Sequence, residues 1–477
     1  MNHRLHYKQG LALNSPATEI LYGGAAGGGK SHLMRIAAIW WCASIPGLQV
    51  YLFRRKYKEL LKNHMEGPSG FPTLLGEWIQ RKLVKINHSE LTIEFWNGSK
   101  IFLCHCQHEK DVSNYQGAEI HVLLMDELTH FTETIYRFLR GRCRLGSLHV
   151  PDEFKGRFPR ILCGSNPGSV GHNWVKLSFV DNGAHMEIVQ MPKAEGGMRR
   201  QYIPALLSDN PTLLENDPDY ADKLEGLGNP ELIRAMLNGD WDIVAGGMLD
   251  DLWRRAVHVI EPFPIPASWH VDRAFDWGGT RPFSVGWWAE SDGTEATLAD
   301  GTKRSFPRGT LFRIGEWYGW NGKANTGLKM LAPDIAAGIN EREMKLPYVA
   351  KERIKPGPAD GMIFNAGTIE DVKSLADVMA AAGVRWTEAD KSPHSRRTGW
   401  QRIREYLSAS LQSPMEKPGL FIFNTCAQWI RTVPVLPRDG RDPDDVDTEA
   451  EDHAGDETRY RLMAPRRQSI GTMEFRI

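Results

Sequence analysis

The sequence has few cysteines and no long apolar run. Six cysteines are scattered over 477 residues, which excludes a disulfide framework and favours a reducing compartment. The cluster Cys104-His105-Cys106 lacks the second ligand pair of a structural zinc site. The longest apolar run, residues 36–45, is too short to span a bilayer, and residues 1–15 show no signal-peptide pattern. We therefore expect a cytoplasmic protein without a membrane span.

Net charge is also almost absent. The 58 Lys and Arg residues balance 59 Asp and Glu residues to leave −1, whereas a nucleic-acid partner usually demands a basic surface. The total is nevertheless a sum of opposed segments. Residues 1–64 hold nine basic and two acidic residues, and residues 438–457 hold two basic and ten acidic ones. The neutral total therefore does not exclude a DNA partner.

Residues 1–245 alternate short apolar runs with helical patterns. Ile20 to Tyr22 precede a glycine-rich turn and a helical pattern over residues 31–44, and Asn97-Gly98 joins two strand-like runs in a hairpin. This alternation predicts an α/β domain with a mostly parallel central sheet. From residue 203 to 245 the pattern is helical and polar, which predicts a small helical subdomain.

A linker and a second domain are predicted after residue 245. Gly246-Gly247 and the proline-rich residues 261–266 favour a linker over 246–266. In residues 267–477, strand-like runs come first and helical patterns at 325–340 and 369–382 follow. The strand runs predict an antiparallel meander, and the whole segment predicts a mixed sheet.

The glycine-rich turn fits the phosphate-binding pattern G-x-x-x-x-G-K-[ST] at every position. Such a loop points backbone N–H groups at phosphate oxygens, and the following helix adds its positive end. Lys30 is expected to reach the β- and γ-phosphates, and the Ser31 hydroxyl to coordinate Mg²⁺. The residues of the loop are Gly24, Ala25, Ala26, Gly27, Gly28, Gly29, Lys30 and Ser31.

Two further polar segments follow buried strand patterns. Asp126 and Glu127 come directly after the apolar run 121–125. Ligands bind at the carboxyl ends of strands in such sheets, so Asp126 is expected to hold Mg²⁺ and Glu127 to act as general base on water. The loop after residues 160–163 carries Ser165 and Asn166, which are expected to sense the γ-phosphate.

Separated carboxylates of the second segment are candidates for a metal site. If they converge in the fold, they could hold two divalent ions that cleave a phosphodiester. Spacing alone does not show convergence, and acidic surface residues are common. The alternative is a set of unrelated surface acids. The candidates are Asp276, Asp360, Asp452 and Asp456.

Taken in order, these motifs resemble the large subunit of the tailed-bacteriophage terminase, a DNA-packaging motor with its own nuclease. The resemblance covers almost the whole chain. It rests on GGAAGGGKS at 23–31, VLLMDE at 122–127, GSNPG at 164–168, DNP at 209–211, GDW at 239–241, FDWG at 275–278 and DHAGDETRY at 452–460.

The resemblance implies a P-loop NTPase domain, with a lid subdomain at about 203–245, and a ribonuclease-H-like nuclease domain. It implies ATP with Mg²⁺ in the first domain, with Gln9 against the adenine unless it is a plain surface residue. In the second domain it implies two Mg²⁺ or Mn²⁺ ions on Asp276, Asp360 and Asp456, with Asp452 as a helper.

One departure from the family concerns arginine. Some relatives carry an Arg inside the phosphate loop, where this chain has only Gly and Ala. The charge-stabilising arginine is then expected from elsewhere, including a neighbouring subunit. Arg142 is the first candidate and Arg54 or Arg55 the second. Contacts to DNA phosphates, or no function at all, are the alternatives for each.

The resemblance implies ATP-driven translocation of double-stranded viral DNA into a procapsid and metal-dependent cutting of concatemeric DNA. The implied partners are a small terminase subunit, the capsid portal protein and further copies of the chain in a ring. The implied place is the host bacterial cytoplasm, transiently on the portal and not in the mature virion. The alternatives are a helicase or repair ATPase with an appended nuclease, and a packaging ATPase whose second domain only binds DNA.

Overall fold

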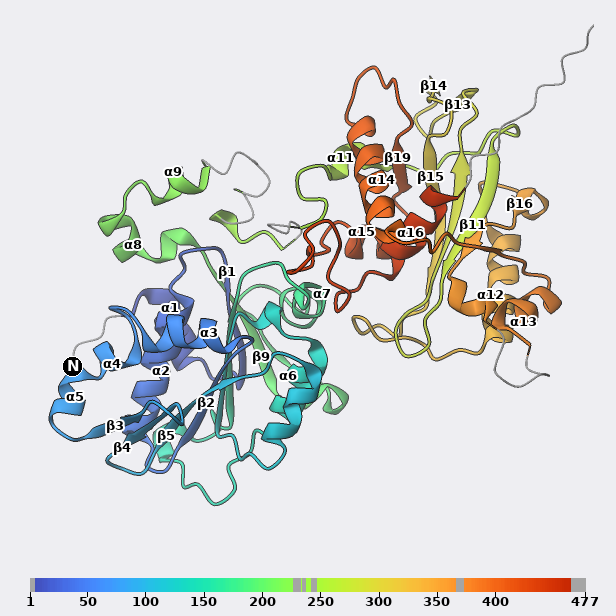
Figure 1. Ribbon diagram of the computed structural model, residues 1–477. Helices are drawn as coiled ribbons and strands as arrows, with labels where there is room; N and C mark the ends of the chain where they lie inside the picture. The colour runs from blue at the N-terminus through green and yellow to red at the C-terminus, as the bar shows by residue number, and fades with distance from the viewer. Residues whose placement is uncertain (1–4, 226–232, 234–236, 242–246, 366–372, 465–477) are drawn as a thin grey trace, which may run out of the picture. The chain divides into compact units, whose positions relative to one another are not determined.

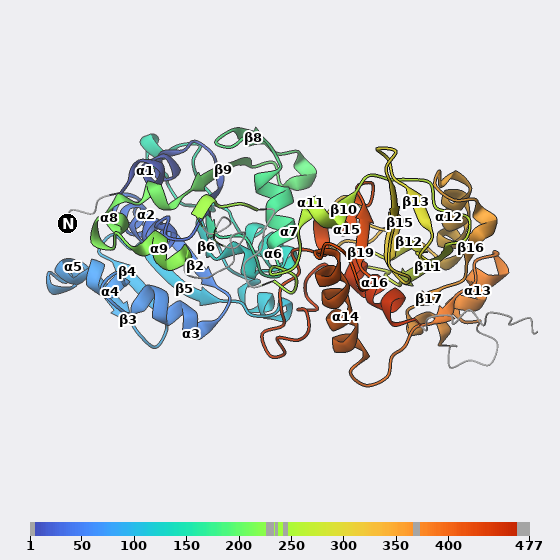
Figure 2. The same ribbon diagram turned by 90° about the horizontal axis from the view of Figure 1, so that it is seen from above.

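The computed structural model describes residues 5–225, 233, 237–241, 247–365 and 373–464. The chain divides into two units, Met1–Asp250 and Asp251–Ile477 (Figures 1 and 2). The division falls inside the predicted linker 246–266. Each unit has its own sheet and its own core. Within the described residues, the model contains no helix with the length and apolarity that a bilayer crossing requires.

The described part of the first unit holds a nine-stranded sheet in the order β3-β4-β5-β2-β6-β7-β1-β9-β8. The pairs from β5 to β9 are parallel, and the pairs at the two edges are antiparallel. The mostly parallel sheet is therefore confirmed. Its strands are β1 (Glu19–Gly24), β2 (Gln49–Arg54), β3 (Val84–Asn87), β4 (Thr92–Phe95), β5 (Lys100–His105), β6 (Val122–Asp126), β7 (Arg160–Ser165), β8 (Ile188–Gln190) and β9 (Arg199–Ala205).

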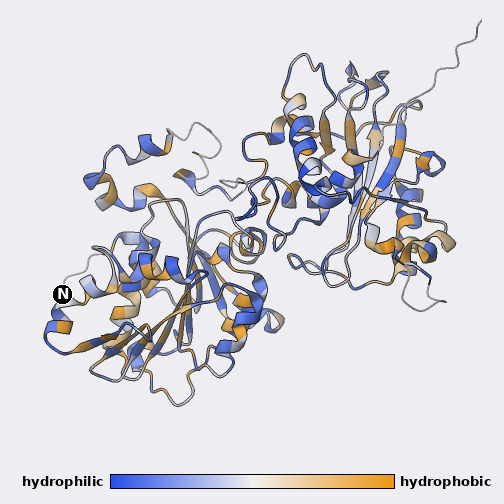
Figure 3. Cartoon of the chain, in the orientation of Figure 1, coloured by the Kyte–Doolittle hydropathy of each residue, from blue (hydrophilic) through white to orange (hydrophobic). Residues whose placement is uncertain are grey.

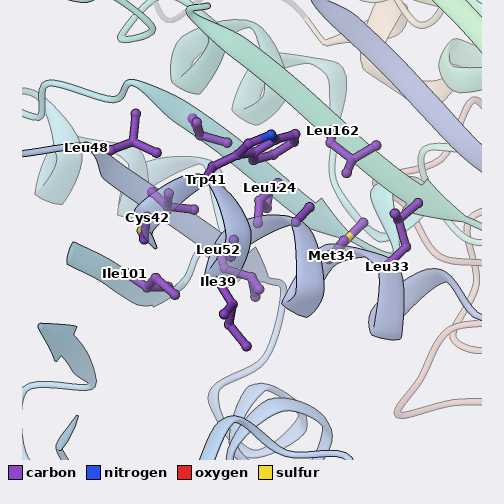
Figure 4. Close-up of a cluster of buried hydrophobic side chains, with 14 of the residues drawn as sticks. Leu33, Met34, Ile39, Trp41, Cys42, Leu48, Leu52, Ile101, Leu124 and Leu162 are labelled. Atoms are coloured by element: carbon purple, nitrogen blue, oxygen red, sulfur yellow. The ribbon is translucent and has the colours of Figure 1, made fainter. Parts of the chain in front are cut away.

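The central strands are mostly apolar and buried, as expected for a parallel sheet with helices on both faces. Strand β6 is buried at every residue. Helix α2 (Lys30–Ser44) packs its apolar residues against neighbouring strands (Figure 4). This packing fixes the start of α2, and hence the glycine-rich turn, at the carboxyl end of β1. The cluster includes Leu33, Met34, Ile39, Trp41, Cys42, Leu48, Leu52, Ile101, Leu124 and Leu162.

The predicted helical subdomain begins later than residue 203. Residues 203–205 belong to β9, which pairs with β1 in the central sheet. Ile203 and Ala205 are buried in the core there, so this segment is a strand and not part of the helical subdomain. The helical segment starts after Ala205, with a short 3₁₀ turn at Leu207–Asp209. Part of residues 226–246 lies outside the described residues. The other α-helices in the described part of this unit are α1 (Tyr7–Asn14), α3 (Tyr57–Leu60), α4 (Phe71–Leu74), α5 (Gly76–Gln80), α6 (Glu133–Arg140), α7 (His172–Val175), α8 (Pro211–Asn216) and α9 (Tyr220–Glu225).

The second unit is built on a mixed sheet in the order β10-β19-β15-β12-β11-β17-β18, with β16 beside β11. The antiparallel meander β11-β12-β15 is flanked by parallel neighbours on both sides. This arrangement confirms the predicted mixed sheet and its antiparallel meander. The strands are β10 (Val259–Ile260), β11 (His270–Asp276), β12 (Ser284–Glu290), β15 (Leu311–Tyr318), β16 (Ile354–Lys355), β17 (Pro358–Ala359), β18 (Thr387–Glu388) and β19 (Leu420–Phe423), with a separate hairpin of β13 (Glu295–Thr297) and β14 (Lys303–Ser305).

The helices of this unit carry both polar and apolar residues (Figure 3). The helical pattern predicted from residue 325 begins only at Ala332, because Pro333 starts the first turn and residues 320 and 327 form a bridge before it. The pattern predicted from 369 begins at Leu375 after the Ser374 cap, and residues 366–372 lie outside the described residues. The helices are α11 (Arg255–His258), α12 (Ala332–Lys345), α13 (Leu375–Ala381), α14 (Ser395–Ser410), α15 (Ala427–Thr432) and α16 (His453–Met463).

Candidate functional site

The glycine-rich turn lies between β1 and α2, as the sequence predicts. Gly27 and Gly29 have φ angles of +75° and +74°, a region that L side chains rarely adopt. A Cβ at Gly29 would also lie 2.4 Å from the Gln9 side-chain nitrogen. Glycine at these positions therefore lets the backbone turn tightly in front of the helix, where N–H groups are available to an anion.

Lys30 joins this turn to the loop after β7. Its buried Nζ donates to the Ala25 carbonyl at 2.8 Å and to Asn166 Oδ1 at 2.6 Å. Burial lowers the pKa of Lys30, while the charges of Glu127 and Asp126 act in the opposite direction. The ammonium group is therefore held beside two acids, ready for an anionic ligand.

Asp126 is fully buried and lies among several polar and charged side chains. Ser31 Oγ lies 3.2 Å from both of its oxygens. His64 Nε2 lies 3.0 Å and Arg54 Nε 3.5 Å from its Oδ2. Burial raises the pKa of Asp126, but the His64 hydrogen bond and the nearby cations outweigh burial and lower it. Asp126 is therefore ionised and adjacent to Ser31, which suits a shared Mg²⁺ ligand role.

Glu127 follows Asp126 in a left-handed backbone conformation, with φ +58°. This conformation is uncommon outside glycine and frequent at functional sites. Burial, and then the Asp126 charge, raise the pKa of Glu127. Arg54 Nη2 lies 3.9 Å from Glu127 Oε1. A carboxylate with a raised pKa is a better proton acceptor, as a general base must be.

Ser165 at the end of β7 and Asn166 in the following loop connect the lysine with the segment of the acidic pair, and the Asn166 backbone hydrogen-bonds to Glu127. The Thr129 N–H donates to Ser165 Oγ at 3.0 Å, and Thr129 Oγ1 donates to the Asn166 carbonyl at 3.1 Å. Thr129 lies two residues after Glu127. Ser165 and Asn166 are therefore linked to the phosphate loop on one side and to the predicted base on the other.

Gln9 is not a surface residue. It is buried, and its Nε2 donates to the Gly29 carbonyl at 3.0 Å. The sequence reasoning missed its counterpart Asn210, whose Nδ2 donates to the Gly27 carbonyl at 2.6 Å. The DNP motif was the available signal for Asn210. Two amide side chains, one from α1 and one from the start of α8, thus hold the backbone of the phosphate loop.

The candidate arginines lie in different places. Arg142 donates to the Gln116 carbonyl and is bridged through its backbone to Ile120, two residues before β6. The acidic pair lies at the opposite end of β6, roughly 20 Å away at 3.3 Å per residue. Arg142 is therefore remote from the site of its own chain, and a role in a neighbouring subunit stays a prediction. Arg54 contacts the acidic pair, whereas Arg55 donates to the carbonyls of Gln107 and His130.

In the second unit, β11 and β17 bring two of the predicted acids together. Phe275 pairs with Ala359 in parallel register, and the Asp360 N–H donates to the Phe275 carbonyl at 2.9 Å. Asp276 is the last residue of β11 and Asp360 directly follows β17, and adjacent strands are about 4.8 Å apart. The carboxylates therefore start from the same edge of the sheet.

The other two acids are Asp456 in α16 and Asp452, the residue directly before this helix. His453 Nδ1 lies 3.2 Å from Asp276 Oδ2, which places the start of α16 over the end of β11. Burial, opposed by the His453 hydrogen bond and supported by the charges of Asp456 and Asp360, raises the pKa of Asp276 to about 7. Burial and the Asp456 charge also raise the pKa of Asp452. The four predicted acids thus form one electrostatically coupled cluster, which the sequence could not show.

Basic side chains neutralise this cluster. Lys391 pairs with Asp360, and Arg396 donates to Asp452 at 2.9 Å and to Asp456 at 2.8 Å. Within the described ranges, no three Asp, Glu, His or Cys side chains are posed as a ready ligand set, including the cysteines near residue 104. The donors nevertheless fit hard cations, because carboxylate oxygens are the ligands that Mg²⁺ and Mn²⁺ prefer. For a metal ion to bind, Lys391 and Arg396 would have to move away from these carboxylates.

Residues 16–240 match a family described as "Phage terminase large subunit". Among solved structures, the large terminase of a thermophilic bacteriophage in complex with ADP is 15% identical, with 96% of this chain and 98% of that chain covered and a TM-score of 0.39. The HK97 bacteriophage large terminase is 10% identical, with coverage of 98% and 96% and a TM-score of 0.44. The P22 large terminase nuclease domain is 15% identical and covers 46% of this chain and 92% of its own, with a TM-score of 0.31.

A comparison with curated proteins finds no match. The solved structures are too distant for positions to be transferred from them to this chain. The family match instead coincides with the unit that carries the phosphate loop, the acidic pair and the Ser165-Asn166 loop. Residues 16–240, slightly less than half of the chain, are thus similar to the phage terminase large subunit family.

Proposed function

We propose that the chain drives double-stranded viral DNA into a procapsid by ATP hydrolysis and cuts concatemeric DNA with its second unit. The observation that carries the proposal is the hydrogen-bonded cluster of Lys30, Ser31, Asp126, Glu127 and Asn166 at the carboxyl ends of adjacent strands. Their side chains are those that hydrolysis of a nucleoside triphosphate requires. The family match to residues 16–240 supports packaging as the process that uses it.

In the proposed ATPase reaction, Lys30 and the loop N–H groups bind the phosphates, and Gln9 would contact the base. Ser31 and Asp126 would hold Mg²⁺, which neutralises phosphate charge. Glu127 accepts a proton from the attacking water. Arg54 brings a positive charge to the same carboxylates from within the chain, and Arg142 would act only across a subunit boundary.

Hydrolysis would be coupled to movement through two sets of contacts. Asn166 contacts Lys30 directly, so loss of the γ-phosphate would change its surroundings. Asn210 contacts the phosphate loop at the start of α8, in the predicted lid. A shift of the phosphate loop would therefore be passed through Asn210 directly to the start of α8.

In the proposed nuclease reaction, Asp276, Asp360 and Asp456 would hold two Mg²⁺ or Mn²⁺ ions, with Asp452 beside them. Such ions activate water and stabilise the leaving oxygen. His453 and Asn325 would orient Asp276, since His453 Nε2 lies 2.9 Å from Asn325 Oδ1. The proposed partners are double-stranded DNA, a small terminase subunit and the portal, on which copies of the chain form a ring in the host cytoplasm.

The test is packaging in a purified system. The full chain, procapsids and linear double-stranded DNA are mixed with ATP, and DNA protected from added DNase is measured. We expect protection that requires ATP and is lost in Lys30→Ala. Separation of DNA strands without procapsids, and no protection with them, would instead favour a helicase or repair enzyme.

A further inference from the structure

His64 is a buried residue that the proposed reaction does not yet use. It is 0% exposed and lies in a single π-helical turn, Leu61–Met65, after α3. Such turns occur often at functional sites. Arg35 Nη1, from α2, donates to the Asn63 carbonyl at 2.7 Å and so fixes the turn against the helix that follows the phosphate loop.

The only hydrogen-bonding partner of the His64 ring among the described residues is the Asp126 carboxylate. Nε2 lies 3.0 Å from Asp126 Oδ2, and Nδ1 is buried without a partner. Because a carboxylate can only accept, the ring hydrogen must lie on Nε2. If His64 served only to fill space in the core, an apolar side chain would do so without burying an unpartnered nitrogen.

The His64 side chain contacts one carboxylate oxygen of Asp126, Oδ2, and not the other. Both His64 and Arg54 lie on Oδ2, while Ser31 Oγ is 3.2 Å from Oδ1 and from Oδ2. These contacts to one oxygen fix the rotation of the Asp126 carboxylate. Oδ1, which the His64 and Arg54 contacts do not involve, is left beside the Ser31 hydroxyl for a metal ion.

We infer that His64 is a positioning residue that orients Asp126 for the Mg²⁺ of the bound nucleotide. This inference rests on the proposed ATPase function and deepens it. Partners of this kind behind a metal ligand fix its orientation, and their loss typically costs 10- to 100-fold in metal affinity. Neither the family match nor any motif assigns this role to residue 64.

The test compares nucleotide affinity with and without Mg²⁺ in the full chain. The probe is a fluorescent, non-hydrolysable ATP analogue, titrated in EDTA and in Mg²⁺. The ratio of the two Kd values reports the Mg²⁺ site and not general folding. His64→Phe keeps a ring but removes the donor, whereas His64→Gln can place its Nε2 near the original position.

We expect His64→Phe to reduce the Mg²⁺-dependent gain in affinity by about 10-fold or more, and His64→Gln to keep it within about threefold of wild type. If His64→Phe does not fold, His64→Leu replaces it with the same expectation. A purely structural role would change both Kd values equally and leave the ratio intact, which overturns the inference. A wild-type chain without any Mg²⁺ effect would instead contradict the proposed function itself.

Discussion

At the scale of single residues, burial prepares the acids of both units for different chemistry. In Asp126 the surrounding cations outweigh burial and keep the carboxylate charged. In Glu127 and Asp276 burial prevails and raises the pKa. Neighbouring side chains therefore decide whether a buried carboxyl group is kept charged or has its pKa raised.

Glu127→Gln removes the predicted base while keeping the shape of the side chain. We expect kcat for ATP hydrolysis to fall by about 100-fold or more, with nucleotide affinity retained, because Lys30 and Ser31 are untouched. Steady-state ATPase assays and equilibrium binding measure the two quantities. The matched control is Glu153→Gln at an exposed position. Equal kcat values in the two variants would show that Glu127 is not the base.

Asp276 predicts a pH dependence of stability in the metal-free protein. Its folded pKa of about 7 lies above the ordinary value of about 3.9. Between these values the folded chain binds a proton that the unfolded chain has lost, so stability falls as pH rises, by about 1.4 kcal/mol per unit at most. The elevated pKa of His453, which bonds to Asp276, acts in the same direction.

Chemical denaturation in EDTA at pH 5, 6, 7 and 8 measures this slope. We expect Asp276→Asn to flatten it, because an amide does not titrate. A variant whose stability falls with pH as steeply as that of wild type would refute the assignment of the proton to Asp276.

At the scale of elements, the close approach of β1 and β7 sets the geometry of the first site. A Cβ at Gly23 would lie 2.0 Å from the Ser165 carbonyl oxygen. The atom that such a Cβ would meet belongs to the backbone, so no flexible side chain can move away to make room. The two strands that end in the phosphate loop and in the Ser165-Asn166 loop therefore depend on a glycine for their spacing.

Gly23→Ala is expected to destabilise the chain by about 2 kcal/mol or more, since overpacking typically costs 1–3 kcal/mol, and to weaken nucleotide binding. Gly98→Ala is the control, because Gly98 also has positive φ but no atom lies within 4 Å of its Cβ position. Denaturation midpoints and nucleotide Kd values measure both effects. Equal nucleotide affinities in the two variants would contradict the spacing argument.

At the scale of the whole molecule, the two units keep separate cores and separate clusters of acids. A unit with its own core generally folds and works independently. The two proposed activities should therefore be lost one at a time when their residues are changed.

Asp360→Ala is expected to abolish Mn²⁺-dependent plasmid cleavage and to leave ATP hydrolysis within about twofold of wild type, because the two units fold separately. Lys30→Ala should do the reverse. Gel analysis of plasmid DNA and phosphate release measure the two activities. Cleavage that persists in Asp360→Ala would make the second unit a DNA-binding module with surface acids.

The sequence by itself determined the local motifs and the fold class. The phosphate loop, the acidic pair after β6 and the hairpin at Asn97-Gly98 are set by neighbouring residues, so their backbone patterns are visible without the fold. The alternation of strands and helices likewise predicted a mostly parallel sheet. The helical segments were placed less well, because β9 and the loop before α12 are defined by pairing partners far along the chain.

Only the tertiary structure decided which side chains meet. Nothing in the sequence connects His64 or Arg54 with Asp126, because these contacts span more than 60 residues and arise from strand order. The convergence of Asp276 and Asp360 depends on the register of β11 with β17. Spacing along the chain carries no such information, whereas sheet register and helix packing fix it, and the neighbours they bring together determine the charge state of each acid.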